Sequence, residues 1–235
     1  MQSTNRPGVH YPVVASGEAA RATRRRLADT GVEAYALDAF ILRPDTLVPD
    51  FEPALAVGAE LGGRRITALV GDPDAGRARD RFSALCDLAA SHGLAVHLEF
   101  HAMSTIRTLA AARAFLGHDH PAGAGIAADS LHLFRSGEGP RALTQDSPVP
   151  VVYAQLCDGP ATIPADRVLD EMVNDRGVPG TGAFDLQGFV RALPPDVVID
   201  LEVPCRALRE RGMAPYDIVG HVVSAGRAVI AAAEG

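Results

Sequence analysis

The chain has no tryptophan, and aromatic residues make up only 5% of its 235 residues. It also lacks long apolar segments: no run approaches the ~20 residues that span a bilayer. The N-terminal stretch MQSTNRPGVHYP has no apolar core of the kind found in signal peptides. With 47% apolar and 22% charged residues the composition is that of an ordinary globular protein. These absences predict a cytoplasmic protein, with one domain over residues 1–235.

Cysteine and basic charge are also scarce. The three cysteines, Cys86, Cys157 and Cys205, are odd in number and widely spaced, which argues against a disulfide framework and a Cys-rich zinc site. The net charge of −7 disfavours nucleic acid and anionic membranes as partners. The basic run at residues 24–26 is interpreted as a solvated helix face. No GxGxxG or Walker pattern is present.

What the sequence does contain is a regular alternation of β-branched runs and helical patterns. The expected strands are residues 32–40, 65–70, 94–100, 124–128, 149–156 and 197–202. The expected helices are residues 16–30, 51–61, 75–91, 104–116, a segment from about 130, 184–193 and 216–233, and residues 158–181 are expected to form a long loop. Strands separated by helices form βαβ units, so the sequence predicts an α/β protein with a parallel, TIM-type (β/α) barrel sheet.

Four of these strands end in or beside a side chain that binds metals through oxygen. The four candidate ligands are Glu99, Asp129, Gln155 and Glu202. The carboxyl ends of parallel barrel strands converge on one face, so these side chains are expected to meet there. A charged carboxylate in an apolar strand is costly unless it is paired, which favours a functional role for Glu99.

Several neighbouring residues are open to two interpretations. His97 and His101 share a strand face with Glu99 and fit either a site or a polar barrel interior. Asp129 fits a ligand or a plain helix N-cap, and His132 three residues later favours the site.

The region after the fifth expected strand is equally ambiguous. Gln155 fits a neutral ligand for a hard cation or a buried, hydrogen-bonded amide. Asp158 is a candidate substrate contact or a turn residue before Gly-Pro. Glu171 and Arg176, in the long loop, are candidates to bind an anion or a polyol, with a surface salt bridge as the alternative. The HDH segment at 118–120 is interpreted as a solvated loop at the opposite strand end.

A set of sequence motifs within residues 32–235, taken together, indicates a protein family. They are LEF, SxIRTL, DSLHxxRSG, YxQLCDGP, an E…R…PGxG loop and LEVP. Together they resemble the xylose isomerase-like TIM barrels, which are identified as sugar phosphate isomerases and epimerases. The superfamily also includes endonuclease-IV-like DNA-repair enzymes, inosose dehydratases and 3-dehydroshikimate dehydratases. The motifs are specific for the superfamily and unspecific for the substrate.

The resemblance implies a ligand set and a metal. Family positions that bind the metal match Glu99, Asp129, Gln155 and Glu202, and positions that contact substrate match His132 and Arg176. Many members have a histidine where this chain has Gln155. An oxygen donor there favours Mn²⁺ or Mg²⁺, with Co²⁺ and Zn²⁺ as alternatives. It also weakens the DNA-repair interpretation, since those enzymes resemble histidine-rich multi-zinc sites.

The resemblance also bears on the strand count. The four ligands end the fifth to eighth strands of these barrels, so residues 32–40 would be the third strand. The first two strands would then be missing, and residues 1–31 would be an incomplete N-terminal part. An open sheet edge exposes unpaired backbone groups, so a homodimer that covers it is predicted.

The function implied is that of a divalent-metal-dependent isomerase or epimerase of a small sugar or polyhydroxy carbonyl compound. Glu99 and Glu202 would remove and return the substrate proton. The candidate substrate contacts are His101, His132, Asp158 and Arg176. A dehydratase-type lyase, with His101 or His132 as the acid, is the first alternative. A catalytically silent ligand-binding barrel is the second.

Overall fold

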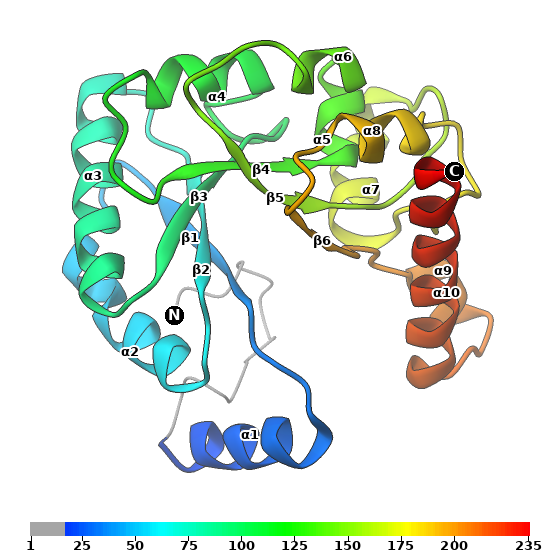
Figure 1. Ribbon diagram of the computed structural model, residues 1–235, viewed down its shortest axis with the longest axis horizontal. Coiled ribbons are helices and arrows are strands. Elements are labelled where there is room, and N and C mark those ends of the chain that lie inside the picture. The colour runs from blue at the N-terminus through cyan, green and yellow to red at the C-terminus, as the bar shows by residue number, and fades with distance from the viewer. Residues whose placement is uncertain (1–16) are drawn as a thin grey trace. The chain divides into compact units, whose positions relative to one another are not determined.

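The computed structural model describes residues 17–235 (Figure 1). Ser16, the expected N-cap of the first helix, lies outside the described residues. The chain forms two compact units: the first runs to Glu99 and adds residues 104–106 and 114–125, and the second contains residues 100–103, 107–113 and 126–235. Within residues 17–235, none of the helices combines the length and apolar character needed to cross a membrane.

The first unit is built on three parallel strands. Its elements are α1 (Gly17–Thr30), β1 (Ala36–Leu42), η2 (Val48–Phe51), α2 (Glu52–Glu60), β2 (Arg65–Val70), α3 (Ala75–Ser91) and β3 (Ala95–Glu99). Strand β2 pairs with β1 on one side and with β3 on the other. Helix α4 (Leu109–Leu116) belongs partly to each unit. The basic run at residues 24–26 is exposed on α1, as interpreted from the sequence.

Aromatic and aliphatic side chains fill the first unit's core. Phe82 of α3 meets Phe115 edge to face, with ring centroids 5.7 Å apart, and Leu85 on the same helix is fully buried. Phe40 of β1 packs in the same way on Phe51, at 5.2 Å. Such pairs add to the hydrophobic free energy of burial.

A buried carboxylate holds the carboxyl end of β2. Asp72 accepts hydrogen bonds from Arg77 Nε at 2.7 Å, Arg77 Nη2 at 2.6 Å and Arg81 Nη1 at 2.7 Å. Arg81 also donates to the carbonyl oxygens of Arg43 and Pro44 at 2.9 and 2.7 Å. The hydrogen bonds from Arg77 lower the pKa of Asp72. This cluster joins α3 to the segment after β1.

The second unit also has three parallel strands. Its strands are β4 (Gly125–Asp129), β5 (Val151–Gln155) and β6 (Val198–Asp200). Its helices are α5 (Ser130–Arg135), α6 (Pro140–Leu143), η3 (Ala165–Arg167), α7 (Val168–Asn174), α8 (Leu186–Ala192), α9 (Arg206–Glu210) and α10 (Pro215–Glu234). The register of β4 and β5 sets Asp129 opposite Gln155, and β6 pairs with the other side of β5.

The last helix, α10, covers the chain that follows β6. Ile218 and Val222 pack in a cluster with Val178, and Leu201 lies against it. A Cβ atom at Gly226 would lie 2.6 Å from Leu201 Cδ2, so a side chain at this position would require Leu201 to move. Helix α8 packs against α10 (Figure 1).

The parallel α/β class expected from the sequence is confirmed, and each expected strand is present within residues 17–235. The expected strand at 32–40 begins only at Ala36. The helix expected from residue 104 begins at Leu109, because the hydroxyls of Ser104 and Thr105 both donate to the carbonyl oxygen of Val70 instead of capping a helix. The N–H of Leu109 donates to the carboxylate of Glu138 at 2.8 Å.

The segment expected to be one long loop, residues 158–181, contains η3 and the helix α7, so that expectation was wrong. Helix α7 has only seven residues and no side-chain cap, so its local signal is weak. Asp170 in its first turn pairs with Arg206, at 2.5 Å from Nη1 and 2.7 Å from Nη2. This tertiary contact stabilises a helix that local propensity does not predict.

Candidate active site

Asp129, the last residue of β4, has a different role for each carboxylate oxygen. Its Oδ1 accepts the N–H of Leu131 at 2.7 Å, which makes it the N-cap of α5. Its Oδ2 accepts from Arg176 Nη1 at 2.7 Å and lies 3.6 Å from His132 Nε2. The side chain is fully buried. The helix-cap interpretation is therefore correct for one oxygen, and the other oxygen faces the candidate site.

Arg176 is a buried cation held between two carboxylates. Its Nη1 lies 2.7 Å from Asp129 Oδ2 and 3.2 Å from Glu202 Oε2, and it also donates to the carbonyl oxygen of Glu202 at 3.3 Å. Its Nε donates to the carbonyl oxygen of Met172 at 3.1 Å, and its backbone N–H to that of Pro204 at 2.9 Å. These bonds fix the guanidinium in place.

Gln155 ends β5 beside Asp129 in the strand register. Its Nε2 donates to Glu202 Oε2 at 2.7 Å. Among residues 17–235, its other amide atom, Oε1, is buried without a hydrogen-bond partner. A buried, unsatisfied acceptor is costly, and a bound cation is one group that would satisfy it. Glu202, two residues after β6, has a side chain that is 38% exposed, so it borders the solvent.

Two neutral histidines lie near the carboxylate of Asp129. The rings of His101 and His132 have centroids 5.4 Å apart. The N–H of Met103 donates to His101 Nδ1 at 3.1 Å, so the proton of the neutral ring is on Nε2. Burial lowers the pKa of each histidine to about 4. At neutral pH both are therefore uncharged, and each ring can donate one hydrogen bond and accept another.

His97 does not share their environment. Its Nε2 lies 2.7 Å from the hydroxyl of Thr67 on β2, within the first unit. Burial lowers the pKa of this ring to about 3. Of the two interpretations that the sequence left open, the contacts support a polar residue buried in the sheet.

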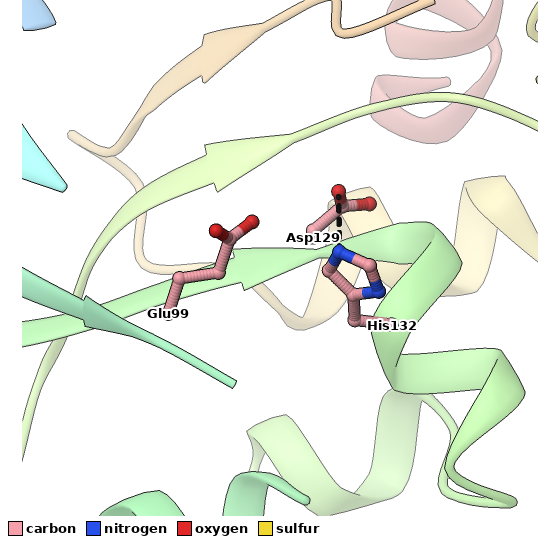
Figure 2. A group of neighbouring side chains, drawn as sticks. All are labelled: Glu99, Asp129 and His132. Carbon is pink, nitrogen blue, oxygen red and sulfur yellow. Dashed lines mark ion pairs between the residues drawn. The ribbon is translucent and has the colours of Figure 1, made fainter. Parts of the chain in front are cut away.

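Glu99 is the last residue of β3 and is 8% exposed. It closes the first unit and directly precedes Phe100, which belongs to the second. Glu99, Asp129 and His132 are three buried side chains that can each offer one ligand atom to a metal ion. Figure 2 shows that they come from the end of β3, the end of β4 and the first turn of α5, and it marks the pair of Asp129 and His132.

Asp158 organises the loop that follows Arg176. Its Oδ1 accepts the N–H groups of Gly159 and Phe184, and its Oδ2 accepts those of Gly180 and Gly182 at 2.9 Å each. A Cβ atom at Gly182 would lie 2.2 Å from Asp158 Oδ1, so only glycine fits there. These contacts fit the turn-shaping interpretation. The predicted substrate contact at Asp158 stays a prediction, and we leave it out of the site proposed below.

Glu171 forms a buried ion pair, where the sequence suggested an anion or polyol contact or a surface salt bridge. Arg135 Nε donates to its Oε2 at 2.8 Å and Arg135 Nη2 to its Oε1 at 2.6 Å. The Arg135 guanidinium lies 4.9 Å from the ring centroid of Phe184. Arg135 is the arginine of the DSLHxxRSG motif, but no role was predicted for it, because nothing local marks Glu171, 36 residues away, as its partner.

The chain belongs to the xylose isomerase-like TIM barrel family, whose model matches residues 5–217. This confirms the family that the motifs resemble. The match also includes most of residues 1–31, which the strand count treats as incomplete. None of the curated proteins matches the chain.

Solved structures of low sequence identity share the fold. The IOLI protein with a bound zinc atom is 18% identical, with a TM-score of 0.79 over 93% of this chain and 84% of its own. The 3-keto-D-glucoside 4-epimerase YcjR from E. coli is 18% identical, with a TM-score of 0.67 over 88% and 83%. An L-ribulose 3-epimerase is 15% identical, with a TM-score of 0.68 over 91% and 80%.

Proposed function

We propose that this protein is a divalent-metal-dependent isomerase or epimerase of a small sugar or polyhydroxy carbonyl compound. The observation that carries the proposal is the buried Oε1 of Gln155, without a hydrogen-bond partner in residues 17–235, beside the carboxylates of Asp129 and Glu202. Carboxylate and amide oxygens are the atoms that bind a hard divalent cation in proteins. Structural neighbours that are epimerases, and one that binds zinc, agree with it.

The residues proposed to hold the metal are Glu99, Asp129, Gln155 and Glu202. All four offer oxygen, which favours Mn²⁺ or Mg²⁺ over Co²⁺ or Zn²⁺. When bound, the ion would polarise the substrate carbonyl and the adjacent hydroxyl as a Lewis acid. His132 is the one nitrogen donor of the group in Figure 2, and we assign it to the substrate.

The proton transfer is proposed to use two glutamates. Gln155 and Arg176 both donate to Glu202 Oε2 and so orient the carboxylate, which is proposed to take the proton from the carbon beside the carbonyl. Glu99 would return a proton to the opposite face or to the neighbouring carbon. Neutral His101 and His132 would hydrogen-bond the hydroxyls of the substrate, and Arg176 would orient an anionic or carbonyl end.

Hydrogen exchange in D₂O tests this function. The protein, stripped with a chelator and reloaded with Mn²⁺, is incubated with a panel of ketoses, inososes and 3-dehydroshikimate. We expect deuterium to enter one carbon of a product with unchanged formula. Loss of water with growth of an enone absorbance would identify the lyase alternative instead. No exchange with any member of the panel would contradict catalytic turnover and favour the alternative of a catalytically silent ligand-binding barrel.

A matched pair of variants assigns the base. Glu202→Gln keeps the shape of the side chain but cannot accept the proton, so exchange should be lost. Glu210→Gln, at the exposed end of α9, makes the same chemical change outside the site and should exchange at the wild-type rate. Equal rates in both variants would show that Glu202 is not the base.

A further inference from the structure

We propose that Arg176 is a built-in counter-ion of the metal site, which balances Asp129 and Glu202 while no metal is bound and competes with the metal for the same oxygens. The inference rests on the metal site proposed above. Its geometrical basis is one guanidinium nitrogen, Nη1, that lies 2.7 Å from Asp129 Oδ2 and 3.2 Å from Glu202 Oε2. Both residues belong to the proposed ligand set.

The guanidinium is fixed rather than adaptable. Its side chain is only 3% exposed, and the carboxylate of Asp129 is not exposed at all. Arg176 follows α7 by two residues and donates through Nε to Met172 O on that helix. Its backbone N–H is held by Pro204 O on the segment after β6. The cation is therefore held from both sides of the site, and metal binding must take place in its presence.

The charges of Asp129 and Glu202 explain why a cation such as Arg176 is needed between them. A fully buried carboxylate is stable in its ionised form only when it is paired, and Asp129 has Arg176 as its charged partner. Glu202 Oε2 accepts from the same nitrogen and from Gln155 Nε2. Arg176 thus offsets the charge of two proposed ligand carboxylates and holds them near one another.

The same charge opposes the metal. A divalent ion bound to Asp129 and Glu202 would lie within a few ångströms of the guanidinium, and the burial of Arg176 and Asp129 limits the screening of the repulsion by solvent. Coulomb repulsion at such a separation corresponds to roughly a tenfold or greater loss of affinity. Arg176 therefore has opposite effects on the two states: it stabilises the metal-free fold and weakens metal binding.

Titration of Mn²⁺ into chelator-stripped full-length protein, by calorimetry, measures the second effect. Arg176→Gln should bind Mn²⁺ about tenfold more tightly than wild type, while its metal-free melting temperature falls. Arg176→Lys keeps the charge, so its affinity should stay within about threefold of wild type. A purely structural role would move the affinity of Arg176→Gln in the other direction, because a disordered site binds metal less well.

Arg206→Gln is the matched control, since it breaks an ion pair with Asp170 that includes no proposed ligand. Its melting temperature should fall without a change in Mn²⁺ affinity. Wild-type protein that binds Mn²⁺ while Arg176→Gln binds no more tightly would overturn the counter-ion role and leave the proposed function standing. No uptake by either protein would overturn both. Uptake by Arg176→Gln alone would support the counter-ion role and contradict metal dependence of the natural chain.

Folding of the variant is followed in parallel by thermal melts with and without Mn²⁺. Added Mn²⁺ should raise the melting temperature of Arg176→Gln by more degrees than that of wild type, because the metal takes over the charge balance. A variant that is unfolded under both conditions would overturn the proposal, since the metal would then be unable to replace the guanidinium.

Discussion

Two buried aspartates of this protein both lie at the end of a strand and pair with arginine, but they differ in how many donors they have. Asp72 lies just after β2, and Asp129 is the last residue of β4; each binds arginine with its carboxylate. Asp72 accepts three hydrogen bonds from Arg77 and Arg81 and one from the backbone N–H of Asp74. Asp129 has one arginine, which it shares with Glu202.

The difference lies in the balance of donors and acceptors. Around Asp72, the guanidinium groups of Arg77 and Arg81 both bind the buried carboxylate, and Arg77 also reaches Asp74, so both oxygens of Asp72 are satisfied and the cluster joins two segments of the first unit. Around Asp129, one guanidinium serves two carboxylates, and the buried Oε1 of Gln155 is left over among residues 17–235. A surplus of buried acceptors is costly to the fold, and it is what a cation site needs. An aspartate paired with arginine thus has a structural role at Asp72 and is part of a candidate site at Asp129.

The largest expected difference between the Asp129 site and the Asp72 cluster is in the rate of catalysis. Glu202→Gln should lower the rate of solvent deuterium exchange by about 10³-fold, the typical contribution of a general base. Asp72→Asn should leave the rate of the folded protein unchanged. The measurement is exchange by NMR with a substrate found in the panel. A comparable loss in both variants would mean that the effect of Glu202 acts through the fold.

The second comparison is between two aspartate replacements and their effect on metal binding. Asp129→Ala should abolish binding of Mn²⁺ and lower the free energy of unfolding by about 3 kcal/mol, because it leaves Arg176 short of a partner and removes a helix cap. Asp72→Asn should lower the melting temperature and leave the Mn²⁺ affinity unchanged. Metal analysis and urea unfolding measure the two quantities. Retention of one Mn²⁺ per chain in Asp129→Ala would exclude Asp129 as a ligand.

A smaller change should alter the preference for the metal. Gln155→His replaces an oxygen donor by a softer nitrogen, so the ratio of Zn²⁺ to Mn²⁺ affinity should rise by about tenfold. Gln155→Glu keeps oxygen and should hold the Mn²⁺ preference. Competition titrations of the two metals give the ratio. An unchanged ratio in Gln155→His would show that this position does not contact the metal.

The smallest effect concerns pH. Hydrogen bonds from Arg77 hold the pKa of Asp72 below its usual value of 3.8. The folded protein therefore holds the proton less tightly than the unfolded chain, and the stability from this pair is complete above about pH 4. It is lost as the pH falls below 3.8 through the lowered pKa. The destabilisation caused by Asp72→Asn, measured by urea unfolding, should thus shrink from pH 7 toward pH 2, and a constant difference would contradict this account.

Local patterns in the sequence predicted much of this molecule. The strand at 65–70 and the helix at 75–91 have the expected bounds, because alternation, an Asp74 cap and a terminal glycine all act within a few residues. The strand-end positions of the candidate ligands Asp129 and Gln155 were predicted in the same way, from where buried runs stop. These features need no knowledge of distant partners.

The remainder depends on contacts between residues far apart in the chain. Helix α7 is anchored by Asp170 to Arg206, 36 residues away, and the sequence gives no sign of this pairing. For Asp129 the sequence left a choice between a helix N-cap and a ligand, because a sequence does not assign the two carboxylate oxygens separately. In the structure Oδ1 caps α5 and Oδ2 binds Arg176. The contacts of Arg176 to Asp129 and Glu202, 47 and 26 residues away, are equally invisible to local patterns.

The loop fastened by Asp158 has a consequence for the protection of its backbone amides from solvent. Gly180 and Gly182 are exposed residues, yet their N–H groups both donate to one buried carboxylate, and Asp158 and Gly177 exchange two backbone hydrogen bonds of 2.8 Å. The segment after Arg176 is thus held by hydrogen bonds within the chain itself. These glycine amides should therefore exchange with solvent deuterons far more slowly than their position on a surface loop would suggest.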